Sequence, residues 1–264
     1  MRKTNFHTHT HLCKHAGGTE EDYVNEALRQ RLDVLGFSDH APYPDDRYGL
    51  RMDYRELAPH ISKLQNLKRS LRDKLEIRIG LEIEYDPFWT EYYKSLLREG
   101  GVEYFLLGQH IYIDKQGQPV NVYFIEQERD TSSYIDYANS IKAGMETGLF
   151  RAIAHPDLMF INKLPYDENG EKACSIIIQA AKDTGTFLEF NANGFRREKD
   201  NYPGGEFRYP YPYKPFWEMA AKQNIPVIVS SDCHEPRKLW DTKMKLAHRM
   251  AKELHLHVVD HIFS

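Results

Sequence analysis

Four histidines lie within nine positions near the start of the chain, in the stretch NFHTHTHLCKH (residues 5–15). Thr8 and Thr10 separate the first three, and this alternation has the period of a β-strand, which places the three imidazoles on one face. Imidazoles crowded on one strand face are typical of metal ligands. The stretch therefore predicts a metal site, with a polar strand end as the simpler alternative, and the rest of the chain must supply the other ligands.

Residues able to bind a metal follow each of the other short apolar runs. They stand in the segments FSDHA, GLEIEY, GQH, AHPD, EFNANG and SSDCH, and they are Asp39, His40, Glu82, Glu84, His110, His155, Glu189, Asn191, Asp232 and His234. Each alone has an ordinary explanation, such as a helix cap, a buried ion pair or a satisfied core histidine. Because all of them stand at the ends of predicted strands, where the active site of a βα barrel forms, we expect them to converge.

Of the remaining histidines, one is a further candidate metal ligand and the others are not expected to bind a metal. His15 follows the first run by a short loop and is counted with the cluster. His11 is expected behind the ligands or at the surface, and His60, inside a helical pattern, is expected to be a surface residue. The stretch HLHVVDH, residues 255–261, is interpreted as a solvated last element.

The elements that must position these residues alternate between strands and helices. Short apolar runs predict strands at residues 4–9, 34–38, 77–83, 104–108, 151–154, 187–190 and 227–230. Amphipathic patterns predict helices at residues 20–31, 54–74, 132–147, 170–184 and about 237–253. Alternating units of this kind predict a parallel sheet. Seven units without a linker favour a closed barrel formed as one domain by residues 1–264, and an open doubly wound sheet is the alternative.

The composition narrows the class of protein. With 41% hydrophobic residues the chain can bury a sizeable core, and its net charge of −4 gives no support for a nucleic-acid or membrane surface. The start lacks an apolar signal region, and no window approaches the roughly 18 apolar residues of a membrane-spanning helix. Cys13, Cys174 and Cys233 form no CxxC pair. We therefore expect a cytoplasmic protein that binds neither nucleic acid nor membrane.

The ordered segments HTHTH, FSDHA, GLEIE, GQH, AHPD and SSDCH resemble those of the polymerase and histidinol phosphatase (PHP) superfamily over essentially the whole chain. The opening FHTHTHLCKHAGGTEEDYV is similar to the stand-alone histidinol-phosphate phosphatase branch. The resemblance implies an α/β fold, a distorted (β/α)7 TIM-like barrel with two or three divalent metal ions. It implies one ion on His7, His9, Glu82 and Asp232, a second that shares Glu82 and adds His110 and His155, and a third on His15, His40 and His234. Glu84 has no ligand role in that pattern.

These nitrogen and oxygen donors suit zinc, iron or manganese. The softness of the ligand atoms does not distinguish between these metals. Clustered divalent ions suit phosphomonoester hydrolysis, which is among the slowest uncatalysed reactions. The reaction implied is hydrolysis of L-histidinol phosphate to L-histidinol and phosphate in histidine biosynthesis, by a metal-bridging hydroxide. Glu82, Asp232 and His234 are the expected catalytic residues, and Asp232 or His234 is the candidate acid for the leaving oxygen.

Substrate-binding residues are expected in two stretches. Arg196 and Arg197, in NGFRRE after the sixth strand, could hold the phosphate, with Arg197 preferred, or could be a solvated basic pair. Asn191 could orient the substrate beside them. Tyr123 and Glu126 lie in DKQGQPVNVYFIEQERD after His110, a long segment expected to close over the ammonium and imidazole of the substrate.

Other functions fit parts of the pattern. A phosphatase for phosphotyrosine or another small phosphomonoester would use the same ligands. A nuclease would need a basic face that the composition does not indicate, and an amidohydrolase would leave His15, His40 and His234 unexplained. A metal-binding protein without activity would fill every coordination position. Cysteine-phosphatase chemistry is excluded, because no cysteine has an arginine six positions later. The oligomeric state is not indicated.

Overall fold

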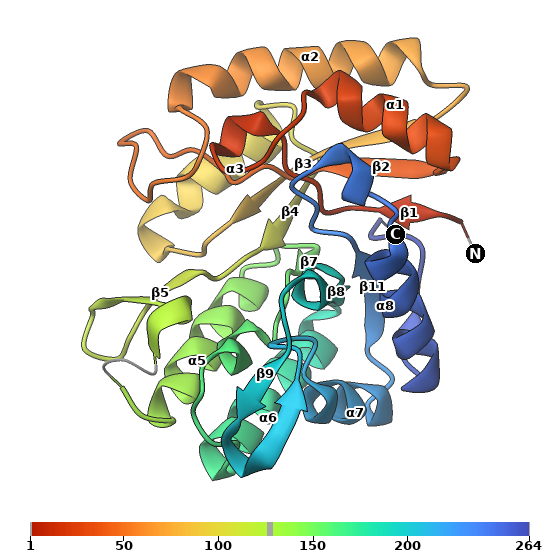
Figure 1. The fold of residues 1–264 in the computed structure, drawn as a ribbon. Coiled ribbons are helices and arrows are strands. Elements are labelled where there is room, and N and C mark those ends of the chain that lie inside the picture. Colours follow the sequence, from red (N-terminus) through yellow and green to blue (C-terminus); the bar gives the residue numbers. More distant parts are fainter. Residues whose placement is uncertain (1, 126–128, 264) are drawn as a thin grey trace.

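A computed structural model describes residues 2–125 and 129–263, and it contains one eight-stranded parallel sheet (Figure 1). The strands in spatial order are β1 (Thr4–Asn5), β2 (Val34–Phe37), β3 (Glu76–Ile83), β4 (Tyr104–Leu107), β7 (Ala152–Ile153), β8 (Phe187–Asn191), β11 (Pro226–Ser230) and β12 (His257–Val258). Every neighbouring pair in this order is parallel. All seven predicted strands are present, although the first and the fifth, β1 and β7, pair over two residues only.

The chain after β1 closes the sheet against the chain after β11. Thr8 pairs with Cys233 in a parallel bridge, and the Asn5 side chain accepts a hydrogen bond from Ser231 N at 2.7 Å. β12 extends the sheet beyond β11, outside this seven-stranded circuit. His255, His257 and His261 are exposed, as expected for a solvated last segment, and β12 is a short strand that the sequence pattern did not reveal. Two paired residues are too few to show a strand periodicity in the sequence.

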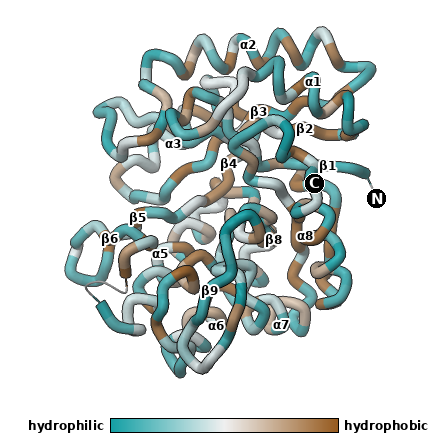
Figure 2. Tube along the Cα trace, in the orientation of Figure 1, coloured by the Kyte–Doolittle hydropathy of each residue, from teal (hydrophilic) through white to brown (hydrophobic). Residues whose placement is uncertain are grey.

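Seven helices of eight or more residues lie around the strands of the described chain. They are α1 (Glu20–Gln30), α2 (Leu57–Ser70), α3 (Thr90–Arg98), α5 (Ser132–Glu146), α6 (Glu168–Thr184), α7 (Lys214–Lys222) and α8 (Thr242–Glu253). Figure 1 shows α1 and α2 on one side of the sheet and α5, α6 and α7 on the opposite side. Hydrophobic and hydrophilic residues alternate along these helices, as Figure 2 shows. In α2 the buried residues Leu57, His60, Ile61 and Leu64 have helical spacing, which gives one face toward the strands.

The sequence patterns do not reveal α3, α7 or two small hairpins. The hairpin of β5 (Ile111–Ile113) and β6 (Pro119–Asn121) follows β4. The hairpin of β9 (Asp200–Tyr202) and β10 (Glu206–Arg208) follows β8. These elements have three to nine residues, which is shorter than the window over which periodicity is informative.

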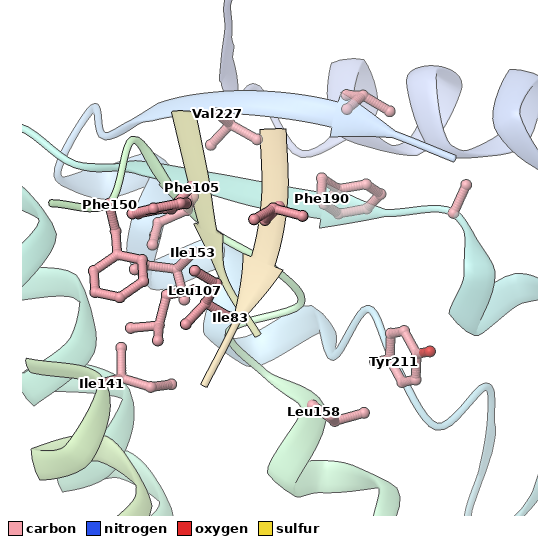
Figure 3. Close-up of a cluster of buried hydrophobic side chains, with 14 of the residues drawn as sticks. Ile83, Phe105, Leu107, Ile141, Phe150, Ile153, Leu158, Phe190, Tyr211 and Val227 are labelled. Atoms are coloured by element: carbon pink, nitrogen blue, oxygen red, sulfur yellow. The ribbon is translucent and has the colours of Figure 1, made fainter. Parts of the chain in front are cut away.

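Two apolar layers hold the barrel together. The outer layer packs strand residues against the helices, and Figure 3 shows Ile83, Leu107 and Ile153 of neighbouring strands near Ile141 of α5. The inner layer fills the barrel below the strand ends. Tyr104 lies across it, and its hydroxyl donates to Phe6 O at 2.7 Å. These inward-facing residues form the floor beneath the polar strand ends.

The Tyr104 ring requires a glycine on the neighbouring strand. A Cβ atom at Gly80 would lie 2.3 Å from the ring of Tyr104.

Among the described residues, no helix has the length and apolar character needed to cross a membrane.

Candidate metal centre

The nine predicted ligands converge at the carboxyl ends of the strands, with Glu82 of β3 at their centre. Five imidazoles surround its carboxylate. The nitrogens nearest to Oε2 belong to His7 (3.3 Å), His9 (3.4 Å) and His40 (3.0 Å), and those nearest to Oε1 belong to His155 (3.1 Å) and His110 (3.7 Å). The five histidines follow four different strands and Glu82 lies on a fifth, so the barrel topology brings them together.

The other three predicted ligands lie close to His9. Asp232 Oδ1 is 3.2 Å from His9 Nε2, and the imidazole of His234 stacks on that of His9 with ring centroids 4.4 Å apart. His15 Nε2 and His234 Nε2 face each other at 3.0 Å. The structure therefore groups all nine predicted residues.

The arrangement of His15 and His234 fits a bound cation. Nδ1 of His15 donates to Cys13 O at 2.7 Å and Nδ1 of His234 donates to Asp232 O at 3.2 Å, since a carbonyl oxygen only accepts. Burial lowers the pKa of both imidazoles, so the rings are neutral and each Nε2 carries a lone pair. Two lone pairs 3.0 Å apart repel each other unless a metal ion lies between or beside them.

The arrangement of buried side chains around Glu82 also fits a bound cation. His7 Nε2 and His9 Nε2 are 2.9 Å apart, and His7 Nδ1 is already bonded to the carboxylate of Glu189 at 2.8 Å. Glu82 Oε2 and His40 Nδ1 are buried and 3.0 Å apart, but neither atom meets hydrogen-bond geometry with any described residue. Three sets of donor atoms each lie within 4.8 Å of one another, namely His7–His9–Glu82, His40–Glu82–His110 and His9–His40–His234. These residues fit divalent metal ions.

The pKa values of Glu82, Asp232 and His234 match ligand chemistry. Burial would lower the pKa of His7 and His155, but the neighbouring carboxylates raise both. Burial would raise the pKa of Glu82 and Asp232, but the surrounding imidazoles hold both well below the usual carboxyl range. Burial, together with the neighbouring His9, lowers the pKa of His234 to about 3. Ionised carboxylates and neutral imidazoles are the forms that bind metals. The acid for the leaving oxygen, with Asp232 and His234 as its candidates, stays a prediction.

Local backbone features keep the ligands in place. His155 and Asp232 have left-handed φ values of 33° and 46°, a conformation that costs energy in residues other than glycine and is concentrated at functional sites. A Cβ atom at Gly108, at the end of β4, would lie 2.0 Å from Glu82 Oε1. Glycine is thus required beside the central carboxylate.

A second layer of side chains orients the ligands, a role that no sequence pattern indicated for these residues. Glu189 accepts from His7 Nδ1, from His155 N at 3.1 Å and from Asn191 Nδ2 at 2.8 Å. Glu84 Oε1 lies 3.1 Å from His110 Nδ1 and also pairs with the guanidinium of Arg51. A carboxylate on the second ring nitrogen fixes the tautomer of a metal-binding histidine. The position of Glu189 at a strand end was the only available signal for its role.

His60 corrects another expectation. It is buried rather than exposed, with Nδ1 bonded to Glu20 at 2.7 Å and Nε2 lying 3.5 Å from Asp39. Asp39 in turn accepts from the Thr10 backbone at 2.7 Å. Because Thr10 and Asp39 adjoin His9 and His40 in sequence, this network fixes the segments that carry two ligands. Charged partners far along the chain, not the local pattern, determine the burial of His60.

A pocket of about 720 Å³ opens over the cluster. Its wall includes the predicted substrate residues Tyr123 and Arg197 as well as Asn193. The Arg197 guanidinium lies over the ring of Tyr123, 5.6 Å from its centroid, and Tyr123 stacks on His110. Arg197 is therefore positioned to meet a ligand above the cluster.

Two other expected substrate contacts are not placed there. The guanidinium of Arg196 is occupied by Asp241, Ser231 and Lys238 O, and it does not line the pocket. Arg196 thus anchors the start of α8 instead of a phosphate. Asn191 is buried and donates to Asp232 Oδ2 at 3.1 Å, so it orients a ligand rather than a substrate. Glu126 lies outside the described residues.

Comparison with known proteins adds independent findings. The family model described as PHP domain matches residues 5–193. A probable histidinol-phosphatase of Deinococcus radiodurans is 30% identical over 87% of this chain and 85% of its own length. The histidinol-phosphatase of Bacillus subtilis is 28% identical over 89% and 94%. A crystal structure of Lactococcus lactis histidinol phosphate phosphatase with Zn, L-histidinol and phosphate superposes with a TM-score of 0.73. It covers 98% of this chain and 95% of its own at 16% identity, and it is similar to this chain in fold.

Proposed function

The chain belongs to the PHP domain family, and from this we propose that it is a metal-dependent histidinol-phosphatase. It would hydrolyse L-histidinol phosphate to L-histidinol and phosphate. The observation that carries the proposal is the cluster of nine metal-binding side chains beneath one pocket, in a chain whose curated relatives are histidinol-phosphatases. We treat residues 1–264 as one such domain, because the matched region and β11 share a continuous sheet.

We assign the ligands as the family pattern and the distances together suggest. His7, His9, Glu82 and Asp232 would hold one ion; Glu82, His110 and His155 a second; and His15, His40 and His234 a third. Two or three divalent ions, zinc, iron or manganese, are compatible with these donors. Bound divalent ions supply an activated water at neutral pH and neutralise charge on the phosphoryl oxygens.

Other side chains of the protein would orient the metal ligands and bind the phosphoryl group. Glu189 keeps the proton of His7 on Nδ1, so that Nε2 faces the centre. Asn191 and Asn193 both donate to Asp232 Oδ2, which leaves Oδ1 directed at His9. Arg197, held over Tyr123, would donate to the phosphoryl oxygens with a planar and permanently charged group.

The test is phosphate release from L-histidinol phosphate, before and after chelation, with the metal content measured on the same sample. We expect release that chelation removes and that zinc, iron or manganese restores. p-Nitrophenyl phosphate, phosphotyrosine and single-stranded DNA serve as competing substrates. A higher kcat/KM for any of these would contradict the assigned substrate, and release that survives complete loss of metal would contradict the assigned chemistry.

A further inference from the structure

A second arginine lines the pocket at a position that no motif indicated. Arg51 stands in the loop between β2 and α2, and its side chain is only 8% exposed although it lines the pocket. Tyr43 and Met52 of this loop are both buried and anchor the part of the loop that lies between them. A charged side chain is rarely buried to this extent without a partner and a purpose.

The partner of Arg51 is Glu84. Arg51 Nη2 forms an ion pair with Glu84 Oε1, the oxygen that also lies 3.1 Å from His110 Nδ1. The carboxylate is 2% exposed, and the two donors share one of its oxygens. A guanidinium offers five N–H donors, and within the described chain Nη2 alone of its three nitrogens has a hydrogen-bond partner. The anchor thus holds the guanidinium while leaving donors available beside the pocket.

The topology places Arg51 across the centre from Arg197. Arg51 follows β2 and Arg197 follows β8. In the seven-stranded circuit, β3, β4 and β7 separate these strands on one side, and β11 and β1 separate them on the other. Two guanidinium groups therefore flank the cluster of ligands from opposite walls of one pocket.

We propose that Arg51 is a substrate-contacting residue that donates to a phosphoryl oxygen of the ester, opposite Arg197, with Glu84 as its anchor. A tetrahedral, doubly charged phosphoryl group presents oxygens in several directions, and guanidinium groups on two sides can each meet one of them. The proposal rests on the proposed function as far as the substrate is a phosphate ester. It does not depend on which alcohol carries the phosphate.

The probe is inorganic phosphate, used as a competitive inhibitor of the metal-loaded enzyme with p-nitrophenyl phosphate as the reporter ester. Arg51→Met should raise the inhibition constant of phosphate about 10- to 100-fold, the loss expected for a charge-assisted hydrogen bond. Arg51→Lys should give an intermediate value, because lysine keeps the charge but not the fork. Arg47→Met is the matched control. Arg47 lies in the same loop but pairs with Asp45 and Asp86, away from this pocket.

Metal content and thermal stability are measured on each variant. An inhibition constant within about twofold of wild type in Arg51→Met, or an equal rise in Arg47→Met, would overturn the proposal. A rise that disappears when the variant is fully reloaded with metal would also overturn it, because Arg51 would then act only through Glu84 and His110. If Arg51→Met does not fold, Arg51→Lys carries the same comparison. Failure of L-histidinol phosphate as a substrate would refute the proposed function and leave this comparison intact.

Discussion

Replacement of Glu189 by glutamine tests whether the second layer of side chains controls the metal centre. The Glu189 carboxylate is fully buried and accepts three hydrogen bonds. Oε1 accepts from His7 Nδ1, and Oε2 accepts from His155 N and Asn191 Nδ2. Glutamine has the same shape but only one acceptor oxygen. Whichever way the amide is turned, its NH2 group must face a donor.

The expected loss of metal affinity can be worked out from this contact between two donors. A buried donor left without an acceptor costs about 1–3 kcal/mol, and loss of an outer hydrogen bond to a metal-binding histidine lowers metal affinity about 10- to 100-fold. The two ranges agree, because 1.4 kcal/mol corresponds to about a tenfold change in an equilibrium constant. We therefore expect Glu189→Gln to lose its metal at a chelator concentration about 10- to 100-fold below that required for wild type.

The assay is metal content after equilibration against a series of chelator concentrations, followed by kcat/KM at saturating metal. Glu253→Gln is a suitable control, because Glu253 is exposed on α8 and pairs with Arg249. Metal retention equal to that of wild type in Glu189→Gln would refute the reasoning. So would an equal loss in Glu253→Gln.

Three further outcomes are expected. His9→Ala and Glu82→Ala should each lower kcat/KM at least about 10³-fold, while circular dichroism shows an intact fold. Retained activity in both variants would refute the assignment of these residues as metal ligands. Gly108→Ala should destabilise the protein by about 1–3 kcal/mol in chemical denaturation, since its Cβ atom would meet Glu82 Oε1 at 2.0 Å; unchanged stability and activity would contradict this. Burial would raise the pKa of Glu20, but hydrogen bonds from His60 and Lys63 lower it to about 2. This carboxylate therefore stabilises the fold above its unfolded pKa of ~4.3, and the contribution is lost as the pH falls toward 2. Glu20→Gln should reduce the difference in unfolding free energy between pH 7 and pH 3 by about 2 kcal/mol, and an unchanged difference would count against the assigned pKa.

The repeating pattern of the chain predicted most of the fold. Five of the seven long helices and the seven strands of the circuit were expected within a few residues of where they lie. Strands and helices of this length bury one face each, and the sequence must encode that face as a periodicity. The helices α3 and α7, the hairpins and β12 were missed because their segments are too short to show a period.

The sequence by itself determined which residues gather at the centre. The nine candidate ligands stand at strand ends, and a closed parallel barrel must bring its strand ends together. What only the tertiary structure decided are the partners of these groups. Arg196 anchors Asp241, its neighbour Arg197 faces the pocket, and His60 is buried between carboxylates. Hydrogen bonds and ion pairs depend on atoms meeting within about 3 Å, and residues far apart in the chain reach that distance only once the barrel has closed.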